Sequence, residues 1–241
     1  MNLHIEDTGG TGPAVVLHHG LGCDTTVWSA QIDHLRKKHR VIAFDARGHG
    51  KSPRAQEYSI AALAEDLNGV ATRTVLQKFW LVGHSLAGAV LSEYAGRFSS
   101  RLLGLVYLDA VGDYTSAPQE MKDWFRKHDQ GATAERLQEW FGEMLGPVAK
   151  PDTRRNVLEA VARMDVPAFA ALRASMAEIP GAEILSRFAG PRHAIDALGT
   201  DNPYMPYNFP GVQRRTIPGV SHWLMLDDPA AVNAALDEVI T

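Results

Sequence analysis

The segment 79–88, with the sequence FWLVGHSLAG, contains a serine in a setting that suits nucleophilic chemistry. The apolar start of the segment predicts a buried strand and its end predicts a helix, so Ser85 stands at the turn between them. Such a turn lifts the hydroxyl clear of the sheet and places it near the positive end of the helix dipole. Gly83 and Ala87 are small, as required where the two backbones nearly touch. Serine also caps helices, but the preceding strand favours a nucleophile.

A nucleophilic serine needs a base that accepts its proton. His222 lies in the segment PGVSHW, between the apolar run 212–217 and a final helical pattern that begins at Pro229. A histidine on a loop is commonly exposed to solvent and has no catalytic role. This one follows the last predicted strand, which is the place where such a base is required, so we expect His222 to face Ser85.

A second glycine turn follows the segment VVLHHGLG, residues 15–22. A turn of this kind can point backbone N–H groups into a cleft, where they stabilise the oxyanion of a tetrahedral intermediate. We expect the N–H groups of Leu21 and Leu86 to act as these two donors. The alternative is a tight loop with no part in the chemistry.

These residues need a scaffold, and the hydrophobic pattern supplies one. Short runs rich in Val, Ile, Leu and Phe predict buried parallel strands, and longer amphipathic patterns between them predict helices. The alternation predicts an α/β fold with a parallel central sheet. The predicted strands are 14–17, 41–44, 79–82, 102–108, 193–198 and 212–217, and the predicted helices are 26–38, 60–76, 86–98 and 229–240.

The alternation stops between residues 113 and 180, where four helical patterns follow one another without a convincing strand. We interpret 113–180 as a helical insertion in a core domain formed by 1–112 and 181–241. The large side chains of the insertion either line a substrate pocket or simply pack on the core. The candidates for the pocket wall are Trp124, Trp140, Met144 and Met176.

The composition narrows the function classes. The 241 residues include 45% hydrophobic and 22% charged side chains, which is typical of one globular domain. The net charge of −4, without a basic block, argues against a nucleic-acid partner. No apolar run is long enough to cross a membrane, and the start lacks a signal-peptide pattern, so we expect a cytoplasmic protein without a membrane partner. The single cysteine, Cys23, argues against a disulfide framework or a cysteine-based metal cluster.

Four motifs, HHGLG, FDARGHGKS, VGHSLAG and GVSHW, occur in an order and spacing that resemble the α/β-hydrolase fold superfamily. The resemblance covers nearly the whole chain and is closest in style to the carboxylesterase and enol-lactonase branch. It implies a mostly parallel sheet of about seven strands flanked by helices, with a four-helix cap. Little sequence precedes the HHG strand, so we expect the first antiparallel strand of the family to be missing.

The resemblance also implies a catalytic triad. Ser85 would be the nucleophile, His222 the general base and then the acid, and a carboxylate would orient the imidazole. The family places that carboxylate at the third position beyond a glycine after its seventh strand. Counting from Gly199 leads to Asn202, with Asp201 one position earlier. We therefore expect Asp201 to be the acid, with Asp109 as the alternative.

The expected activity is that of a serine hydrolase that needs no cofactor or metal and cleaves a carboxylic ester or lactone of a small, largely apolar molecule. Serine at the turn argues against dehalogenase and epoxide hydrolase chemistry, whose relatives carry aspartate there. Carbon–carbon bond hydrolysis and cofactor-free perhydrolysis remain alternatives on the same triad. A small-molecule receptor with slow turnover is a further alternative. The sequence leaves open whether the protein is a monomer or a homodimer.

Overall fold

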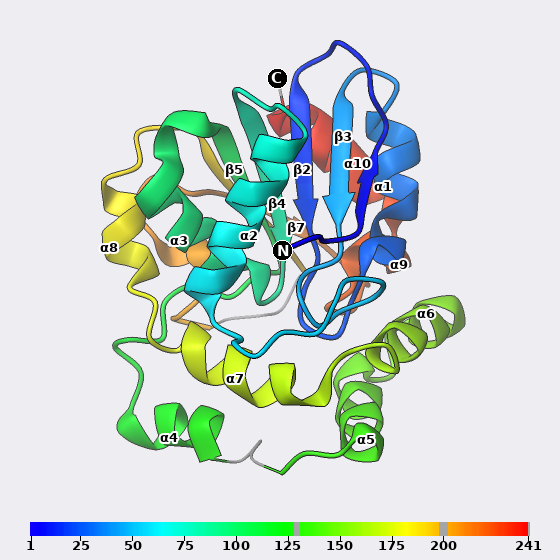
Figure 1. Cartoon of the computed structure of the whole chain (residues 1–241), viewed down its shortest axis with the longest axis vertical. Helices are drawn as coiled ribbons and strands as arrows, with labels where there is room; N and C mark the ends of the chain where they lie inside the picture. The colour runs from blue at the N-terminus through cyan, green and yellow to red at the C-terminus, as the bar shows by residue number, and fades with distance from the viewer. Residues whose placement is uncertain (128–130, 198–201, 241) are drawn as a thin grey trace.

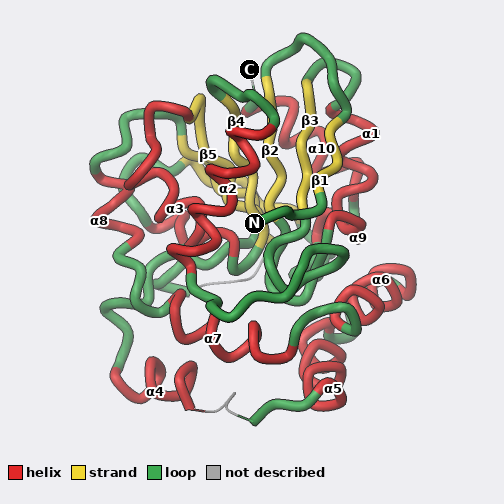
Figure 2. The backbone as a smooth tube through the Cα atoms, viewed as in Figure 1, coloured by secondary structure: helices red, strands yellow, loops and turns green. Residues whose placement is uncertain are grey.

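The computed structural model describes residues 1–127, 131–197 and 202–240. In this part of the chain, a seven-stranded sheet has the order β1-β3-β2-β4-β5-β6-β7. Figure 2 shows β1 to β5 of this sheet in yellow. The β1–β3 pair is antiparallel, and all other neighbouring strands are parallel. The strands are β1 (Ile5–Asp7), β2 (Ala14–His18), β3 (Arg40–Phe44), β4 (Phe79–His84), β5 (Leu102–Leu108), β6 (Arg192–Ala197) and β7 (Gln213–Ile217).

Helices cover both faces of this sheet (Figure 1). Helices α2 and α3 pack together on one face, with α8 beside α3, and α1 and α10 pack together on the other. The described helices are α1 (Ser29–Leu35), α2 (Ile60–Arg73), α3 (Ala87–Phe98), α4 (Gln119–Lys127), α5 (Ala134–Leu145), α6 (Pro151–Val161), α7 (Val166–Met176), α8 (Gly181–Ser186), α9 (Leu224–Asp227) and α10 (Pro229–Val239).

The burial of the strands follows from these layers. All residues of β2 and β4 are buried, because helices cover the sheet on both faces at its centre. The expectation of a buried strand is wrong for β7, in which four of five residues are exposed. This strand lies at the edge of the sheet, where Arg214 and Arg215 oppose pairing with another chain. An antiparallel strand does begin the sheet, contrary to the expectation that the first antiparallel strand is missing, because β1 pairs antiparallel with β3. Its three residues carry no clear hydrophobic period in the sequence.

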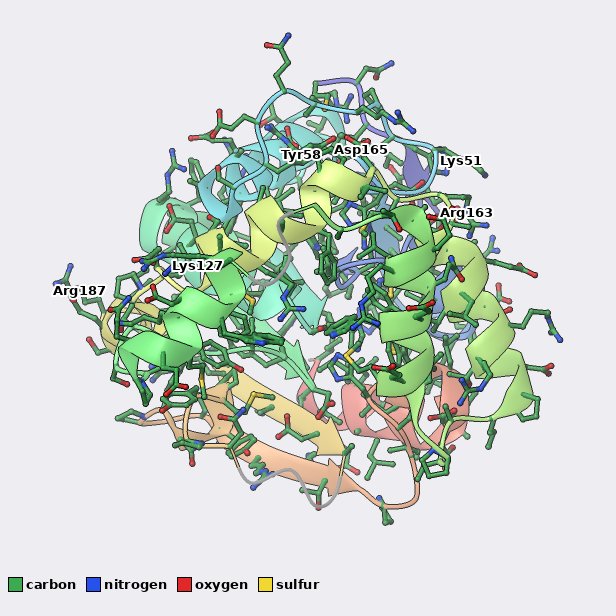
Figure 3. The ribbon with its side chains drawn as sticks, turned by 90° about the horizontal axis from the view of Figure 1, so that it is seen from below. Lys51, Tyr58, Lys127, Arg163, Asp165 and Arg187 are labelled. Carbon is green, nitrogen blue, oxygen red and sulfur yellow. The ribbon has the colours of Figure 1, made fainter. Side chains whose placement is uncertain are left out.

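Helices α4 to α7 lie together beyond the carboxyl ends of the parallel strands (Figure 1). They correspond to the four helical patterns expected in the cap. Seen from this side, α4 lies beside α7, and α5 lies beside α6 (Figure 3). The division of the chain at residues 113 and 180 stays a prediction. Within the described ranges, no helix is both long enough and apolar enough to span a membrane.

Polar contacts attach α6 and α7 to the rest of the molecule. Arg163 pairs with Asp24 at 2.6 Å, and Tyr58 donates to Asp165 at 2.5 Å. Figure 3 shows Tyr58 and Asp165 next to each other. Asp227 accepts from Thr153 at 2.7 Å and from the backbone N–H of Lys150 at 3.0 Å. Hydrogen bonds and ion pairs of this kind have preferred distances and angles, so they fix the position of the cap helices on the core.

Asp227 also joins the cap to the loop that carries His222. Its carboxylate accepts from the backbone N–H of Ser221 at 2.7 Å. Burial raises the pKa of Asp227, but hydrogen bonds from Ser221, Lys150 and Thr153 outweigh burial and leave the pKa below its ordinary value. An ionised Asp227 therefore connects the base loop and the cap at neutral pH.

Candidate active site

Ser85 occupies a strained turn between β4 and α3. Its φ angle is 54°, in the left-handed region that residues other than glycine rarely adopt. Two backbone hydrogen bonds maintain this conformation. The Ser85 N–H donates to the Leu108 carbonyl at 3.2 Å, and the Ser85 carbonyl accepts from the Val111 N–H at 2.9 Å. A Cβ at Gly83 would lie 2.4 Å from Leu91 Cδ1 and 3.0 Å from Ala87 Cβ, so a larger residue there would displace its neighbours.

The glycine turn after β2 comes very close to Ser85. A Cβ at Gly20 would lie 2.8 Å from both Ser85 Cβ and His84 Nδ1. This approach brings Leu21 to the same cavity as Ser85 and Leu86, so the structure places both expected oxyanion residues beside the nucleophile. Gly88 is equally constrained, because a Cβ there would lie 2.1 Å from the Val111 carbonyl oxygen.

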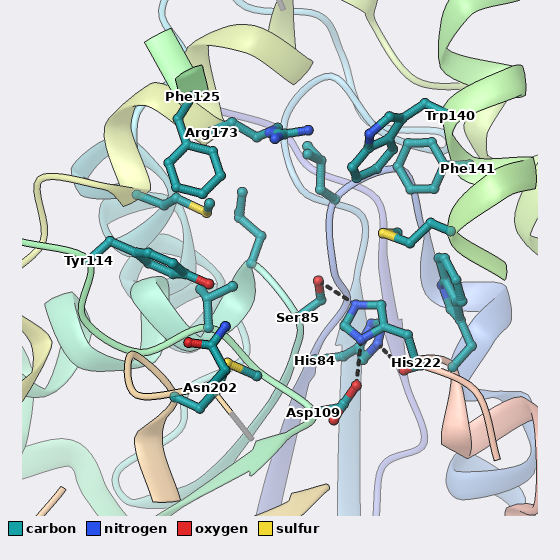
Figure 4. A pocket seen from close by; sticks show the side chains of 17 residues that line it. His84, Ser85, Asp109, Tyr114, Phe125, Trp140, Phe141, Arg173, Asn202 and His222 are labelled. Atoms are coloured by element: carbon teal, nitrogen blue, oxygen red, sulfur yellow. Dashed lines mark hydrogen bonds and ion pairs between the residues drawn. The ribbon is translucent and has the colours of Figure 1, made fainter. Parts of the chain in front are cut away.

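The imidazole of His222 links the serine to a carboxylate (Figure 4). Its Nε2 lies 2.8 Å from Ser85 Oγ, and its Nδ1 lies 2.6 Å from Asp109 Oδ2. A carboxylate oxygen accepts, so Nδ1 carries the proton and Nε2 has the lone pair that faces the serine hydroxyl. This tautomer is the one that general-base catalysis by His222 requires.

The carboxylate that contacts His222 Nδ1 is that of Asp109, the alternative to Asp201. Asp109 directly follows β5 and has a φ angle of 41°, and its Oδ1 accepts from the backbone N–H of Ala197 at 3.2 Å. The expected acid, Asp201, lies outside the described residues, and Asn202 lines the cavity. The preference for Asp201 is therefore corrected in favour of Asp109. Counting positions after one strand could not show that the neighbouring strand already presents a carboxylate to Nδ1.

His84, next to Ser85 in the chain, contacts His222 and helps to position it. Its Nε2–H donates to the His222 carbonyl at 2.9 Å, and the two ring centroids lie 4.6 Å apart. Burial, reinforced by the charge of His222, holds the pKa of His84 well below its ordinary value. A neutral His84 therefore connects the nucleophile turn to the base loop.

A cavity of about 240 Å³ opens above the serine. Of the four predicted wall residues, Trp140, Met144 and Met176 line it. The prediction is wrong for Trp124, whose side chain is 41% exposed and whose neighbour Phe125 faces the cavity instead. A shift of one residue moves a side chain by about 100° around a helix, and the periodicity of α4 alone did not distinguish the two aromatic positions.

Sequence reasoning missed two polar residues in the cavity wall. Tyr114 lies in the connection between β5 and α4, and Arg173 lies on α7, between apolar residues at helical spacing. The only available signal for Arg173 was a cation within the buried stripe of Phe169, Leu172 and Met176.

Two further titratable groups lie buried near the site. Asp196 on β6 is fully buried, and burial together with the nearby charge of Asp109 raises its pKa to about 7. Burial also raises the pKa of the Cys23 thiol to about 12, which leaves it a poor nucleophile. Among the described residues, no group of three or more His, Cys, Asp or Glu side chains is arranged to hold a metal ion.

With this geometry established, comparison with known proteins identifies the class. Residues 13–182 match the α/β hydrolase fold family, so the chain belongs to that family and the resemblance inferred from its motifs is confirmed. A putative carbamate hydrolase of Variovorax paradoxus is 40% identical over 114 residues, which cover 46% of this chain and 43% of that protein. The first curated relatives are matched over only 30% to 43% of their own length.

Solved structures resemble the chain over nearly its whole length. A thermophilic esterase from Thermogutta terrifontis is 27% identical, with a TM-score of 0.82 over 98% of this chain and 92% of that one. An enol-lactonase from Burkholderia xenovorans is 18% identical, with a TM-score of 0.79 over 98% and 95%. The second similarity concerns the fold alone. The predicted fold class is confirmed.

Proposed function

We propose that this protein is a serine hydrolase that cleaves a carboxylic ester or lactone of a small molecule. The observation that carries the proposal is the chain of hydrogen bonds from Ser85 through His222 to Asp109, at the floor of a largely apolar cavity. This arrangement is the one that acyl transfer needs: a nucleophile, a base in the correct tautomer, and a carboxylate that stabilises the imidazolium.

In the first half of the reaction, Ser85 Oγ attacks the carbonyl carbon and its proton passes to His222 Nε2. The backbone N–H groups of Leu21 and Leu86 would stabilise the oxyanion that forms. The bond to the alcohol oxygen then breaks, and His222 returns the proton to that oxygen. Water attacks the acyl-enzyme in the second half, giving its proton to His222, and Ser85 leaves with a proton from the imidazolium.

The esterase of this shape, which is 27% identical to the chain, supports ester cleavage. The cavity volume of about 240 Å³ lies below the range typical of drug-sized ligands, which favours a small substrate. The cap helices would then select the substrate while the strand ends perform the chemistry.

Labelling with a fluorophosphonate, followed by turnover of p-nitrophenyl esters and lactones, tests the proposal. We expect one label, on Ser85, and a loss of about five to six orders of magnitude in kcat for Ser85→Ala. A label on Cys23 or on another serine would contradict the assignment. Release of a single equivalent of nitrophenol per chain, without further turnover, would instead favour a receptor.

A further inference from the structure

The roof of the cavity contains a buried cation. Arg173 is only 4% exposed, and it lines the same cavity as Ser85. Its guanidinium carbon lies 4.7 to 5.0 Å from the ring centroids of Trp124, Trp140 and Phe169, and 5.3 Å from that of Phe125. Figure 4 shows the guanidinium between Phe125 and Trp140, across the cavity from the serine.

The rings stabilise the cation but do not occupy its hydrogen-bonding groups. Ring faces attract a guanidinium through their quadrupoles, whereas its five N–H donors lie in its own plane and bind oxygen. Arg173 also makes contacts within the chain, and five donors allow it to keep such a contact while binding a carboxylate through two parallel hydrogen bonds. The aromatic neighbours restrict the side chain, so the orientation of the guanidinium is set before a ligand arrives.

The remainder of the cavity makes this cation a strong determinant of specificity. The described lining is mostly apolar, and its carboxylate, Asp109, is engaged by His222 on the opposite side. A charge that is shielded from water interacts more strongly with a ligand charge than the same residue at the surface. An anionic group on the substrate is therefore favoured near Arg173 and disfavoured near Asp109.

We propose that the substrate carries a carboxylate at the end remote from its scissile carbonyl, and that Arg173 binds this carboxylate. The proposal rests on the proposed function and narrows its substrate class to a monoester of a short dicarboxylic acid or a lactone with a carboxylated side arm. Ser85 and Arg173 face each other across a small cavity, so only a few methylene groups separate the carbonyl from the carboxylate.

Matched substrates isolate the carboxylate. The mono-p-nitrophenyl ester of adipic acid is compared with its primary amide, which has the same shape without the charge. A second pair, 4-carboxyphenyl butyrate and 4-carbamoylphenyl butyrate, places the charge on the alcohol. We expect the parent protein to prefer the charged member of at least one pair, measured as the ratio of the two kcat/KM values.

Three variants then assign the preference. Arg173→Met should lower the charged-to-neutral ratio by about ten- to a hundredfold, the effect of losing a hydrogen bond to a charged group, and Arg173→Lys should lower it less. Arg155→Met, which removes an exposed cation of α6 outside the cavity, should keep the parental ratio. A ratio cancels any general loss of activity. An Arg173→Met variant that keeps the parental ratio in both pairs overturns the proposal.

Inhibition of the parent protein provides a test that needs no variant. Glutaramate, the monoamide of glutaric acid with a single carboxylate, should compete with p-nitrophenyl butyrate more strongly than the isosteric glutaramide, and equal inhibition by the two contradicts the proposal. If neutral esters are not hydrolysed and a fluorophosphonate does not label Ser85, the proposed function itself fails. If neutral esters are hydrolysed and Ser85 is labelled, but neither pair of substrates shows a charge preference, only the proposed role of Arg173 fails.

Discussion

The floor and the roof of the cavity are built on different physical principles. The floor is carried by strand ends and sharp turns, and two of its residues, Ser85 and Asp109, have positive φ angles that the sheet around them maintains. The roof consists of side chains from helices, such as Trp140 on α5 and Arg173 on α7, with ordinary helical backbone beneath them.

This difference indicates how the two parts tolerate change. Contacts of 2.6 and 2.8 Å hold the catalytic atoms in line, and a shift of 1 Å in such a geometry can cost about a hundredfold in rate. The roof is positioned by polar contacts at its margins, such as those of Asp24 and Asp227. Side chains between those contacts can change in size without moving the triad. Three experiments test this comparison.

The largest effect is expected at the orienting carboxylate. Asp109→Asn should lower kcat by about four orders of magnitude, because an amide cannot hold the imidazole in the required tautomer or stabilise its charge. Steady-state kinetics with a p-nitrophenyl ester measure the effect. Asp201→Asn is the matched control and should stay within about threefold of the parent. If Asp201→Asn caused the large loss and Asp109→Asn did not, the orienting carboxylate would belong to the loop after β6.

A smaller effect concerns the pH dependence of stability. The pKa of Asp196 is about 7 in the folded protein and about 4 in an unfolded chain. Below about pH 4 both states hold the proton. As pH rises towards 7 the unfolded state ionises first, so the contribution of Asp196 to stability is lost across this window.

Asp196→Asn should therefore gain stability relative to the parent as pH increases from 5 to 8. The expected gain is on the order of 3 kcal/mol, from about 1.4 kcal/mol for each unit of pKa difference. Urea unfolding at both pH values measures it, and Asp152→Asn, at an exposed carboxylate, should show no such gain. A difference between Asp196→Asn and parent that does not change with pH would contradict the raised pKa.

The smallest effect is expected for the shape of the roof. Trp140→Ala should favour longer neutral esters by about 1 to 3 kcal/mol, since it enlarges the cavity without touching the triad. The measurement is the ranking of kcat/KM over acyl chains of increasing length. Val148→Ala, an exposed cap position, should keep the parental ranking. If Trp140→Ala lowered thermal stability but kept the parental ranking of esters, Trp140 would contribute to core packing and not to substrate selection.

Much of the scaffold follows from local sequence. Continuous apolar runs identify the central strands because both faces of such strands are covered, and Gly83 and Ala87 identify the turn at Ser85 because only small residues fit there. The edge strands are less predictable. The exposed arginines of β7 reflect its position at the edge of the sheet, and they weaken the apolar pattern by which a strand is recognised.

Tertiary structure decided what depends on neighbours far apart in the chain. Asp109 precedes His222 by 113 residues, and its role depends on β5 ending beside the His222 loop, which no local pattern encodes. The side of α4 that faces the cavity was also settled by packing, which turned Phe125 inward and left Trp124 half-exposed. By itself, the sequence determined the nucleophile turn and the alternation of strands and helices, because short-range sterics and hydrophobic period suffice for both. The partner of the base and the charge in the roof required the fold, because they are contacts between separate elements.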